Sequence, residues 1–268
     1  MIIDFHTHIF PDPIAKGTIL KLQELSQVNA ATYGTADELV SSMKESGVDV
    51  SIIQPVVTAP KQFSKITEFA NYINENYTDG RLLSFGGVHP ESDSFKDELK
   101  QLKEMGFHGI KLHPDYQGVF FNDINYKRIV SYATELGFII LVHAGIDIGM
   151  PTPIHCTPAM SLEVLKDTEA DKLVLAHLGG WKQWDEVEEF LVGQNVYLDT
   201  AFLKGYMDQE QFSRIVKNHG SDKILFGTDS PWTAQTDAIN WIKNCDLTNA
   251  ETDNIFHNTA LSLLPWLI

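Results

Sequence analysis

The feature of this sequence that most constrains its fold is a regular alternation of short β-rich runs with longer helical patterns. After the opening MIIDF, apolar runs rich in Val, Ile, Leu and Phe recur along the chain. They occupy residues 48–55, 82–90, 106–114, 137–145, 171–180, 195–202 and 222–231. Strands that alternate with helices form parallel βαβ units. In a chain of 268 residues, this alternation predicts a (β/α)8 TIM barrel, with a doubly wound open sheet as the structural alternative.

The segments between the runs have helical signatures. Thr35 and Glu38 form a capping-box pattern, and Gly47 is placed to end the same helix. Residues 63–77 carry apolar side chains at helical spacing. No linker rich in Pro, Gly or Ser divides the chain, so we expect a single domain over residues 1–268.

Charge and composition exclude several classes of function. Lys and Arg number 20 against 36 Asp and Glu, a formal net charge of −16, which repels nucleic-acid phosphates and anionic lipid. No run approaches the ~20 apolar residues of a transmembrane helix, and the N-terminus turns polar too soon for a signal peptide. Cys156 and Cys245 lie far apart and predict neither a disulfide framework nor a thiolate zinc site. We therefore expect a cytoplasmic protein with a small-molecule substrate.

Ionisable residues gather where the predicted strands end. In a (β/α)8 barrel the active site is built at the C-terminal ends of the strands. The residues at these ends are His6, His8, His89, Lys111, His113, His143, His177 and Asp229. Each alone has a structural explanation, such as a hydrogen-bonded core histidine or, for Asp229, a cap of the next segment. Together they are unlike barrel packing, where Val, Ile and Ala fill such positions.

The first pair shows how such residues could converge. In a strand, Asp4, His6 and His8 share one face, and imidazoles at this spacing can reach one metal ion. The motifs DFHTH, LVHAG, LAHLGG and FGTDSP, between residues 4 and 231, resemble those of the metal-dependent amidohydrolase superfamily. The resemblance is to the amidohydrolase-related branch that includes aminocarboxymuconate-semialdehyde decarboxylase. It implies a metal-dependent enzyme with a TIM-barrel fold, and homodimers as in many members of the branch.

The resemblance also implies roles for individual residues. His6, His8, His143 and Asp229 would hold one divalent ion, with His177 beside it as the acid/base residue. Three imidazoles and a carboxylate suit zinc, and manganese is the alternative. Asp229 would also accept a proton from the activated water. Asp4 would orient a ligand imidazole, or would be a buried carboxylate satisfied by backbone amides.

Three residues are candidates for substrate binding: Lys111, His113 and Trp232. Strand alternation places Lys111 and His113 on one face. Binuclear members of the superfamily carry a carboxylated lysine at the end of the fourth strand, so Lys111 could be a bridging carbamate. The favoured interpretation is that the ammonium of Lys111 binds a substrate carboxylate. A structural ion pair inside the barrel is a third interpretation of Lys111. Trp232 would shape the pocket.

The leading functional hypothesis is a hydrolase that attacks a small, carboxylate-bearing substrate through metal-activated water. The alternative is a non-oxidative decarboxylase that uses the same site. Phosphoesterases of the TatD type share the H-x-H and T-D-x-P features, but they carry a glutamate where this chain has Lys111. A barrel that only binds metal or ligand is the non-enzymatic interpretation.

Overall fold

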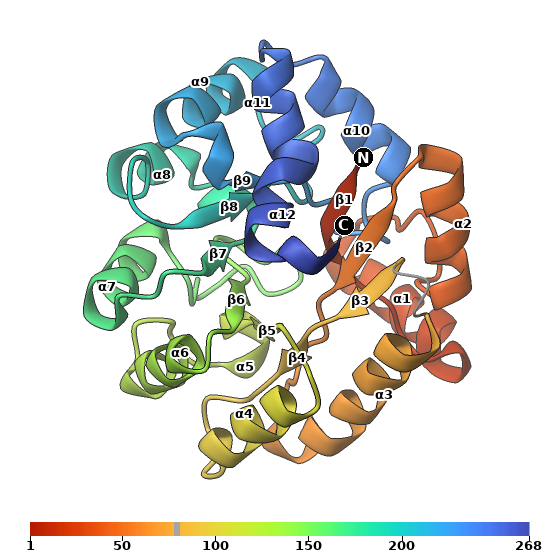
Figure 1. Cartoon of the computed structure of the whole chain (residues 1–268), viewed down its shortest axis with the longest axis vertical. Coiled ribbons are helices and arrows are strands. Elements are labelled where there is room, and N and C mark those ends of the chain that lie inside the picture. The colour runs from red at the N-terminus through yellow and green to blue at the C-terminus, as the bar shows by residue number, and fades with distance from the viewer. Residues whose placement is uncertain (78–80, 268) are drawn as a thin grey trace. The chain divides into compact units, whose positions relative to one another are not determined.

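The computed structural model describes residues 1–77 and 81–267, and these fall into two compact units (Figure 1). The first unit contains the described residues of 1–53, 77–83 and 199–268, so it is built from both ends of the chain. The second unit contains residues 54–76 and 84–198. Strands and helices alternate along the chain in both units, as the sequence predicts. The prediction of a single domain stays a prediction.

In the first unit, strand β1 (Ile3–Thr7) pairs in parallel with β2 (Val50–Ile53). Ser51 N donates to Arg81 O at the start of β3 (Leu82–Ser84). On the other side of β1, Phe5 N donates to Phe226 O, just after β9 (Ile224–Leu225). A parallel bridge joins Thr7 to Ser230. The C-terminal ends of β1 and of the segment after β9 therefore lie side by side.

The second unit contains a row of parallel strands in the order β4 (Gly86–Gly87), β5 (Gly109–Leu112), β6 (Ile139–Val142), β7 (Leu173–Leu175) and β8 (Tyr197–Asp199). The last residue of β8, Asp199, belongs to the first unit. The register sets Leu112 opposite Val142, and Val142 opposite Leu175. Because these residues end their strands, the residues that follow them leave the sheet at one edge. His113 and His143 come directly after β5 and β6, and His177 follows the end of β7 by two residues.

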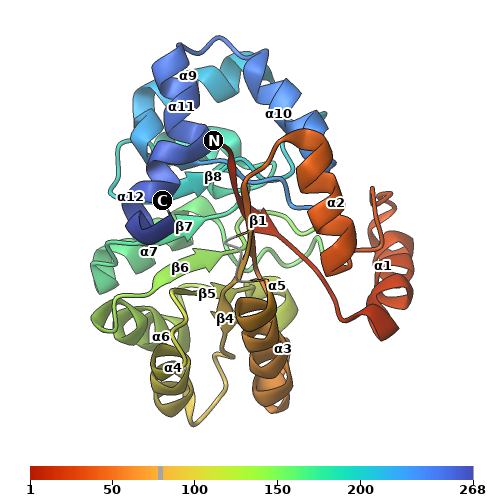
Figure 2. The same cartoon turned by 45° about the vertical axis from the view of Figure 1, so that its right-hand side comes forward.

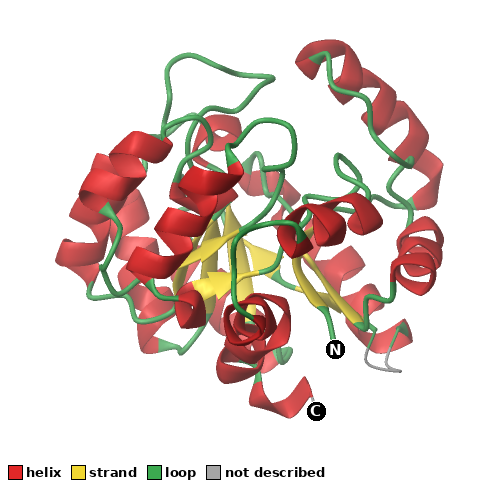
Figure 3. Ribbon diagram, turned by 90° about the horizontal axis from the view of Figure 1, so that it is seen from above, coloured by secondary structure: helices red, strands yellow, loops and turns green. Residues whose placement is uncertain are grey.

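Helices surround the strands (Figure 3), and α12 (Thr259–Leu263) contacts β9. Those of the first unit are α1 (Asp12–Ser26), α2 (Ala36–Ser46), α9 (Gln209–His219), α10 (Gln235–Lys243), α11 (Asn249–Asp253) and α12 (Thr259–Leu263). Those of the second are α3 (Phe63–Asn76), α4 (Phe95–Glu104), α5 (Pro114–Gln117), α6 (Ile124–Glu135), α7 (Pro158–Thr168) and α8 (Trp184–Phe190). Figure 2 shows α3 beside β4 and α6 near β6, and each of these helices contacts the strand named with it.

Local sequence explains several helix ends. Thr35 accepts a hydrogen bond from Glu38 N, Glu38 reaches back to Thr35 N, and Gly47 ends α2 in the left-handed conformation, so the predicted capping box is confirmed. Cys156 and Cys245 are buried and form no disulfide. None of the helices among the described residues combines the length and the apolarity that a bilayer crossing requires.

Gly145 is the position in the second unit that tolerates a side chain least. It lies two residues after His143 with φ +89°, where a Cβ would stand 2.0 Å from Trp181 N. The backbones meet here because Trp181 N donates to Ala144 O at 2.9 Å. The segments after β6 and β7 are thus joined directly beside the two histidines that they carry.

We expect Gly145→Ala to lower the free energy of unfolding by roughly 3 kcal/mol or more, because it adds both a backbone clash and a disfavoured φ. Gly193→Ala is the matched control: its φ is +81°, but a Cβ there meets nothing within 4 Å. It should cost only the left-handed penalty of about 1 kcal/mol. Urea denaturation measures both, and equal losses would contradict the steric explanation.

Candidate metal centre

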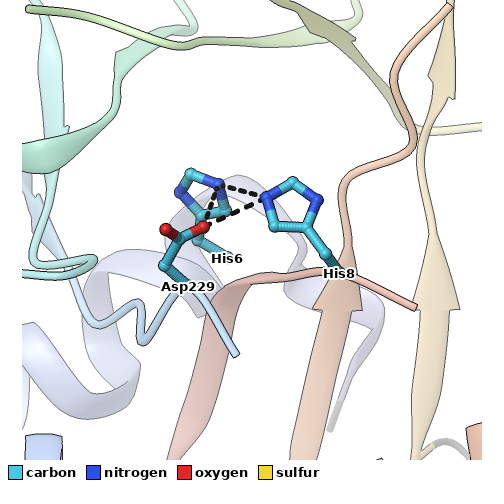
Figure 4. Close-up of side chains that lie close together, drawn as sticks. All are labelled: His6, His8 and Asp229. Carbon is cyan, nitrogen blue, oxygen red and sulfur yellow. Dashed lines mark hydrogen bonds and ion pairs between the residues drawn. The ribbon is translucent and has the colours of Figure 1, made fainter. Parts of the chain in front are cut away.

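Two histidines of β1 and its extension point into one site. His6 is buried and His8, which follows the strand, is half-buried. Their Nε2 atoms lie 3.1 Å apart, and their rings meet edge to face with centroids 5.0 Å apart (Figure 4). The two-residue spacing thus brings both imidazoles to one point, as strand alternation predicts.

Asp229 completes this group from the segment after β9. Its Oδ1 lies 3.1 Å from His8 Nε2 and 3.4 Å from His6 Nε2 (Figure 4). The backbone of Asp229 is left-handed, with φ 61°, a conformation that Asp tolerates better than most residues. Its N–H donates to His6 O at 2.8 Å, and its carbonyl accepts from Trp232 N at 2.9 Å. These bonds aim the carboxylate at the two imidazoles.

The spacing of the three ligand atoms fits a bound ion. Donors about 2.1 Å from a common tetrahedral centre lie about 3.4 Å apart, close to the separations found here. Two imidazoles with a carboxylate are a donor set that zinc and manganese accept. His6, His8 and Asp229 therefore form a group that can hold a divalent metal.

A carboxylate that sequence reasoning missed orients His6. Asp199 ends β8, is fully buried, and its Oδ2 lies 2.8 Å from His6 Nδ1. Its Oδ1 accepts from Ala201 N at 3.0 Å. A proton on His6 Nδ1 leaves the Nε2 lone pair facing His8 and Asp229, which is the arrangement of metal-binding histidines with a carboxylate behind them. The sequence offers one indication, an acidic residue at the end of the apolar run NVYLD.

Asp4 has a role other than orienting a ligand imidazole, which was the first of its two predicted roles. Its carboxylate accepts from Thr228 Oγ1 at 2.6 Å, Gln235 Nε2 at 2.8 Å, Thr228 N at 3.0 Å and His6 N at 3.4 Å. Burial raises the pKa of Asp4 to about 7, although these hydrogen bonds act in the opposite direction. Asp4 thus holds the backbone beside the ligands. This role is closer to the second prediction, a buried carboxylate satisfied by backbone amides. Asp199 makes the contact with the imidazole of His6.

The other predicted histidines gather in the second unit. His143, after β6, stacks on His113, after β5, with ring centroids 4.1 Å apart and planes 7° from parallel. His177 Nε2 lies 3.1 Å from His143 Nδ1. His113 Nδ1 accepts from Tyr116 N and so caps the short helix α5. All three histidines are buried.

The remaining candidates have clear positions. Lys111 lies within β5 and is 1% exposed, so its ammonium, if charged, is buried with its strand. Trp232 is half-buried beside Asp229 in the first unit. His6, His8 and Asp229 share the first unit, whereas His143, His177, His113 and Lys111 belong to the second. The four-ligand set that includes His143 stays a prediction.

A family comparison identifies the chain. A model of the family described as Amidohydrolase matches residues 3–266, nearly the whole sequence. The chain belongs to the amidohydrolase family. The resemblance carried by the four motifs is therefore confirmed at the level of the family. Comparison with curated protein sequences gave no match.

Solved structures confirm the fold of this amidohydrolase. A TIM-barrel protein from Bordetella bronchiseptica is 15% identical, with a TM-score of 0.76, and the match covers 99% of each chain. The 2,6-dihydroxybenzoate decarboxylase from Rhizobium is 16% identical, with a TM-score of 0.72 over 99% of this chain and 98% of that one. A 5-carboxyvanillate decarboxylase variant from Novosphingobium aromaticivorans, solved with bound manganese, is 13% identical, with a TM-score of 0.72 over 99% and 97%. The predicted (β/α)8 fold class is confirmed.

We expect Asp199→Asn to weaken divalent-metal binding at His6, His8 and Asp229 by roughly 10- to 100-fold, because the imidazole of His6 loses its carboxylate partner. Competition with a chromogenic chelator measures the dissociation constant of Zn²⁺ or Mn²⁺. Asp123→Asn is the control: it makes the same chemical change at the N-cap of α6, where Asn caps equally well. Equal affinity in the Asp199 variant and the wild type would contradict this role.

Proposed function

We propose that this amidohydrolase-family protein is a metal-dependent, non-oxidative decarboxylase of a small hydroxybenzoate-type acid. The observation that carries the proposal is its likeness, over nearly the full length of both chains, to decarboxylases of 2,6-dihydroxybenzoate and 5-carboxyvanillate. The hydrolase was the leading hypothesis from the sequence, and decarboxylation was its alternative. The comparisons support the alternative better.

The metal of this proposal is one divalent ion held by His6, His8 and Asp229, with His143 as the predicted fourth ligand. Manganese in the 5-carboxyvanillate decarboxylase makes it as good a candidate as zinc. When bound, such an ion supplies a positive charge that binds and polarises substrate oxygens. Asp199 contributes by holding the His6 ring in the tautomer that binds metal.

Decarboxylation also needs a proton donor. The C–C bond to the carboxylate breaks, its electron pair stays on the ring carbon, CO₂ leaves, and a proton takes its place. We assign the proton to His177, a buried imidazole whose Nε2 lies 3.1 Å from His143 Nδ1. Trp184 Nε1 donates to His177 O at 3.1 Å and holds the backbone of the donor, which has a left-handed φ of 57°. This contact holds the backbone from which the imidazole projects.

Substrate recognition is assigned to three further side chains. An aromatic acid carries a negative charge, and we assign its recognition to the ammonium of Lys111, as the sequence predicts. His113 would contribute a hydrogen bond, and Trp232 an aromatic surface for the ring. The overall charge of −16 acts over distances that salt screens, so it does not oppose a short-range cation of this kind.

The test is an assay of the metal-loaded protein on hydroxybenzoates, lactones and cyclic amides, with CO₂ and acid release measured separately. We expect CO₂ from a hydroxybenzoate and no hydrolysis. His177→Asn should lower kcat by about 10²- to 10⁴-fold while metal content stays unchanged, because only the proton donor is lost. His108→Asn, at the start of β5, is the matched substitution and should retain the wild-type rate. Acid release from a lactone or amide without CO₂ would reject the decarboxylase and restore the hydrolase hypothesis.

A further inference from the structure

The loop between β6 and α7 leaves the second unit and returns to it at one point. Gly145 N donates to Cys156 O at 2.8 Å, so residues 146–155 form a closed excursion that begins just after His143. Asp147 Oδ1 accepts from the backbone N–H groups two and three residues further on, at 2.8 and 3.0 Å, and so fixes the first turn. Compact loops whose ends meet are often functional. The proposed decarboxylation uses no residue of this loop.

His155 is the last residue of the loop, and a carboxylate holds its ring. Its Nδ1 lies 3.0 Å from Oδ1 of Asp115, which is in the first turn of α5. The same oxygen accepts from His155 N at 3.1 Å. Because Oδ1 acts as an acceptor, the ring donates to it from Nδ1. Nε2 is then the acceptor nitrogen of the imidazole.

The carboxylate of Asp115 also faces the predicted active site. Its Oδ2 lies 3.8 Å from Nε2 of His143, the predicted fourth metal ligand, which follows the strand paired with β5 (Figure 1). The side chain of Asp115 is 0% exposed, and Oδ2 makes no hydrogen bond in the part of the chain that the structure describes. Burying an unbonded carboxylate oxygen is costly, so a purely structural pair would be expected to bond both oxygens. His155 therefore lies one carboxylate away from a predicted ligand of the metal.

The acceptor nitrogen of His155 is open to a ligand. The side chain is 11% exposed, and Nε2 makes no hydrogen bond with any residue that the structure describes. Phe120 packs against the imidazole, with ring centroids 4.8 Å apart, and is itself 44% exposed. Phe121 N donates to His155 O at 2.7 Å, so the loops after β5 and β6 are joined at this histidine. An oriented acceptor thus stands beside an exposed aromatic ring.

We propose that His155 binds a hydroxyl group on the aromatic ring of the substrate, which donates its proton to Nε2, and that Asp115 is the positioning residue for this imidazole. The inference rests on the proposed function, because it concerns the same substrate. It requires a hydroxyl group at the bound position and excludes its methyl ether, because a methoxy oxygen has no proton to donate to Nε2. Phe120 offers the substrate ring an aromatic contact at the same place.

The experiment measures binding rather than turnover. The metal-loaded, full-length chain carries His177→Asn so that bound acid is not consumed. Calorimetry gives its dissociation constants for 2-, 3- and 4-hydroxybenzoate and for the three matching methoxybenzoates. We expect one hydroxy acid to bind roughly 3- to 10-fold more tightly than its methyl ether, as one hydrogen bond allows. Adding His155→Asn should remove this preference, because asparagine keeps a donor for Asp115 but has no atom at the position of Nε2. Adding His108→Asn should retain it.

A second measurement needs no substitution at His155. Diethyl pyrocarbonate modifies accessible neutral imidazoles, and mass spectrometry of peptides locates the product. In the His177→Asn protein, His155 should react, and the preferred hydroxybenzoate should protect it better than the methyl ether does. Three results would each overturn the inference: no preference for a hydroxy acid, a preference that survives His155→Asn, or no protection of His155. The pair with Asp115 would then only anchor the loop.

The CO₂ assay of the wild-type chain separates this inference from the proposed function. A hydroxyl preference that depends on His155, without CO₂ release from any hydroxybenzoate, would support the role of His155 and reject the decarboxylase. CO₂ release together with a preference that does not depend on His155 would overturn the role of His155 and leave the decarboxylase in place.

Discussion

The first unit depends on one buried carboxylate, that of Asp4. Its partner Gln235 also donates to Ser51 Oγ at 3.1 Å and accepts from Ser42 Oγ at 2.9 Å. Together, the side chains of Asp4 and Gln235 tie β1 to the segment after β9, to β2, and to helices α2 and α10. A buried carboxylate is tolerated only when donors surround it, so these five elements must be in place together. The position of the ligand pair His6 and His8 follows from that requirement.

Much of the fold could be predicted because its determinants are local. Apolar runs mark the strands, and the capping residues Thr35 and Glu38 mark the start of α2. The third predicted strand is divided into β3 and β4, with Phe85 between them, and this was not predictable. Phe85 fills the space that a side chain at Gly109 would occupy, at 2.6 Å or less from its ring, so the break depends on packing between distant segments.

Part of the candidate site could be predicted because its determinants, like those of the helices and strands, are local in the sequence. His6 and His8 share a strand, so alternation alone predicts that they converge. Asp199 is 193 residues from His6, and nothing in the local pattern couples the two. Asp115 lies in the first turn of the short helix α5 and Asp147 in the loop after β6, places where an acidic residue is usually a solvated or turn residue. Only the fold shows that both are buried with one oxygen directed at His143.

The first unit is assembled from both ends of the chain, and this has a consequence for synthesis. Residues 54–198 are translated before the segment that carries Asp229, so the second unit can fold while the first still lacks its last strand. β1 then has no backbone partner on its β9 side, and His6 and His8 lack their carboxylates. The full set of ligands at this candidate metal centre is therefore present only once the end of the chain has been made and has folded against β1.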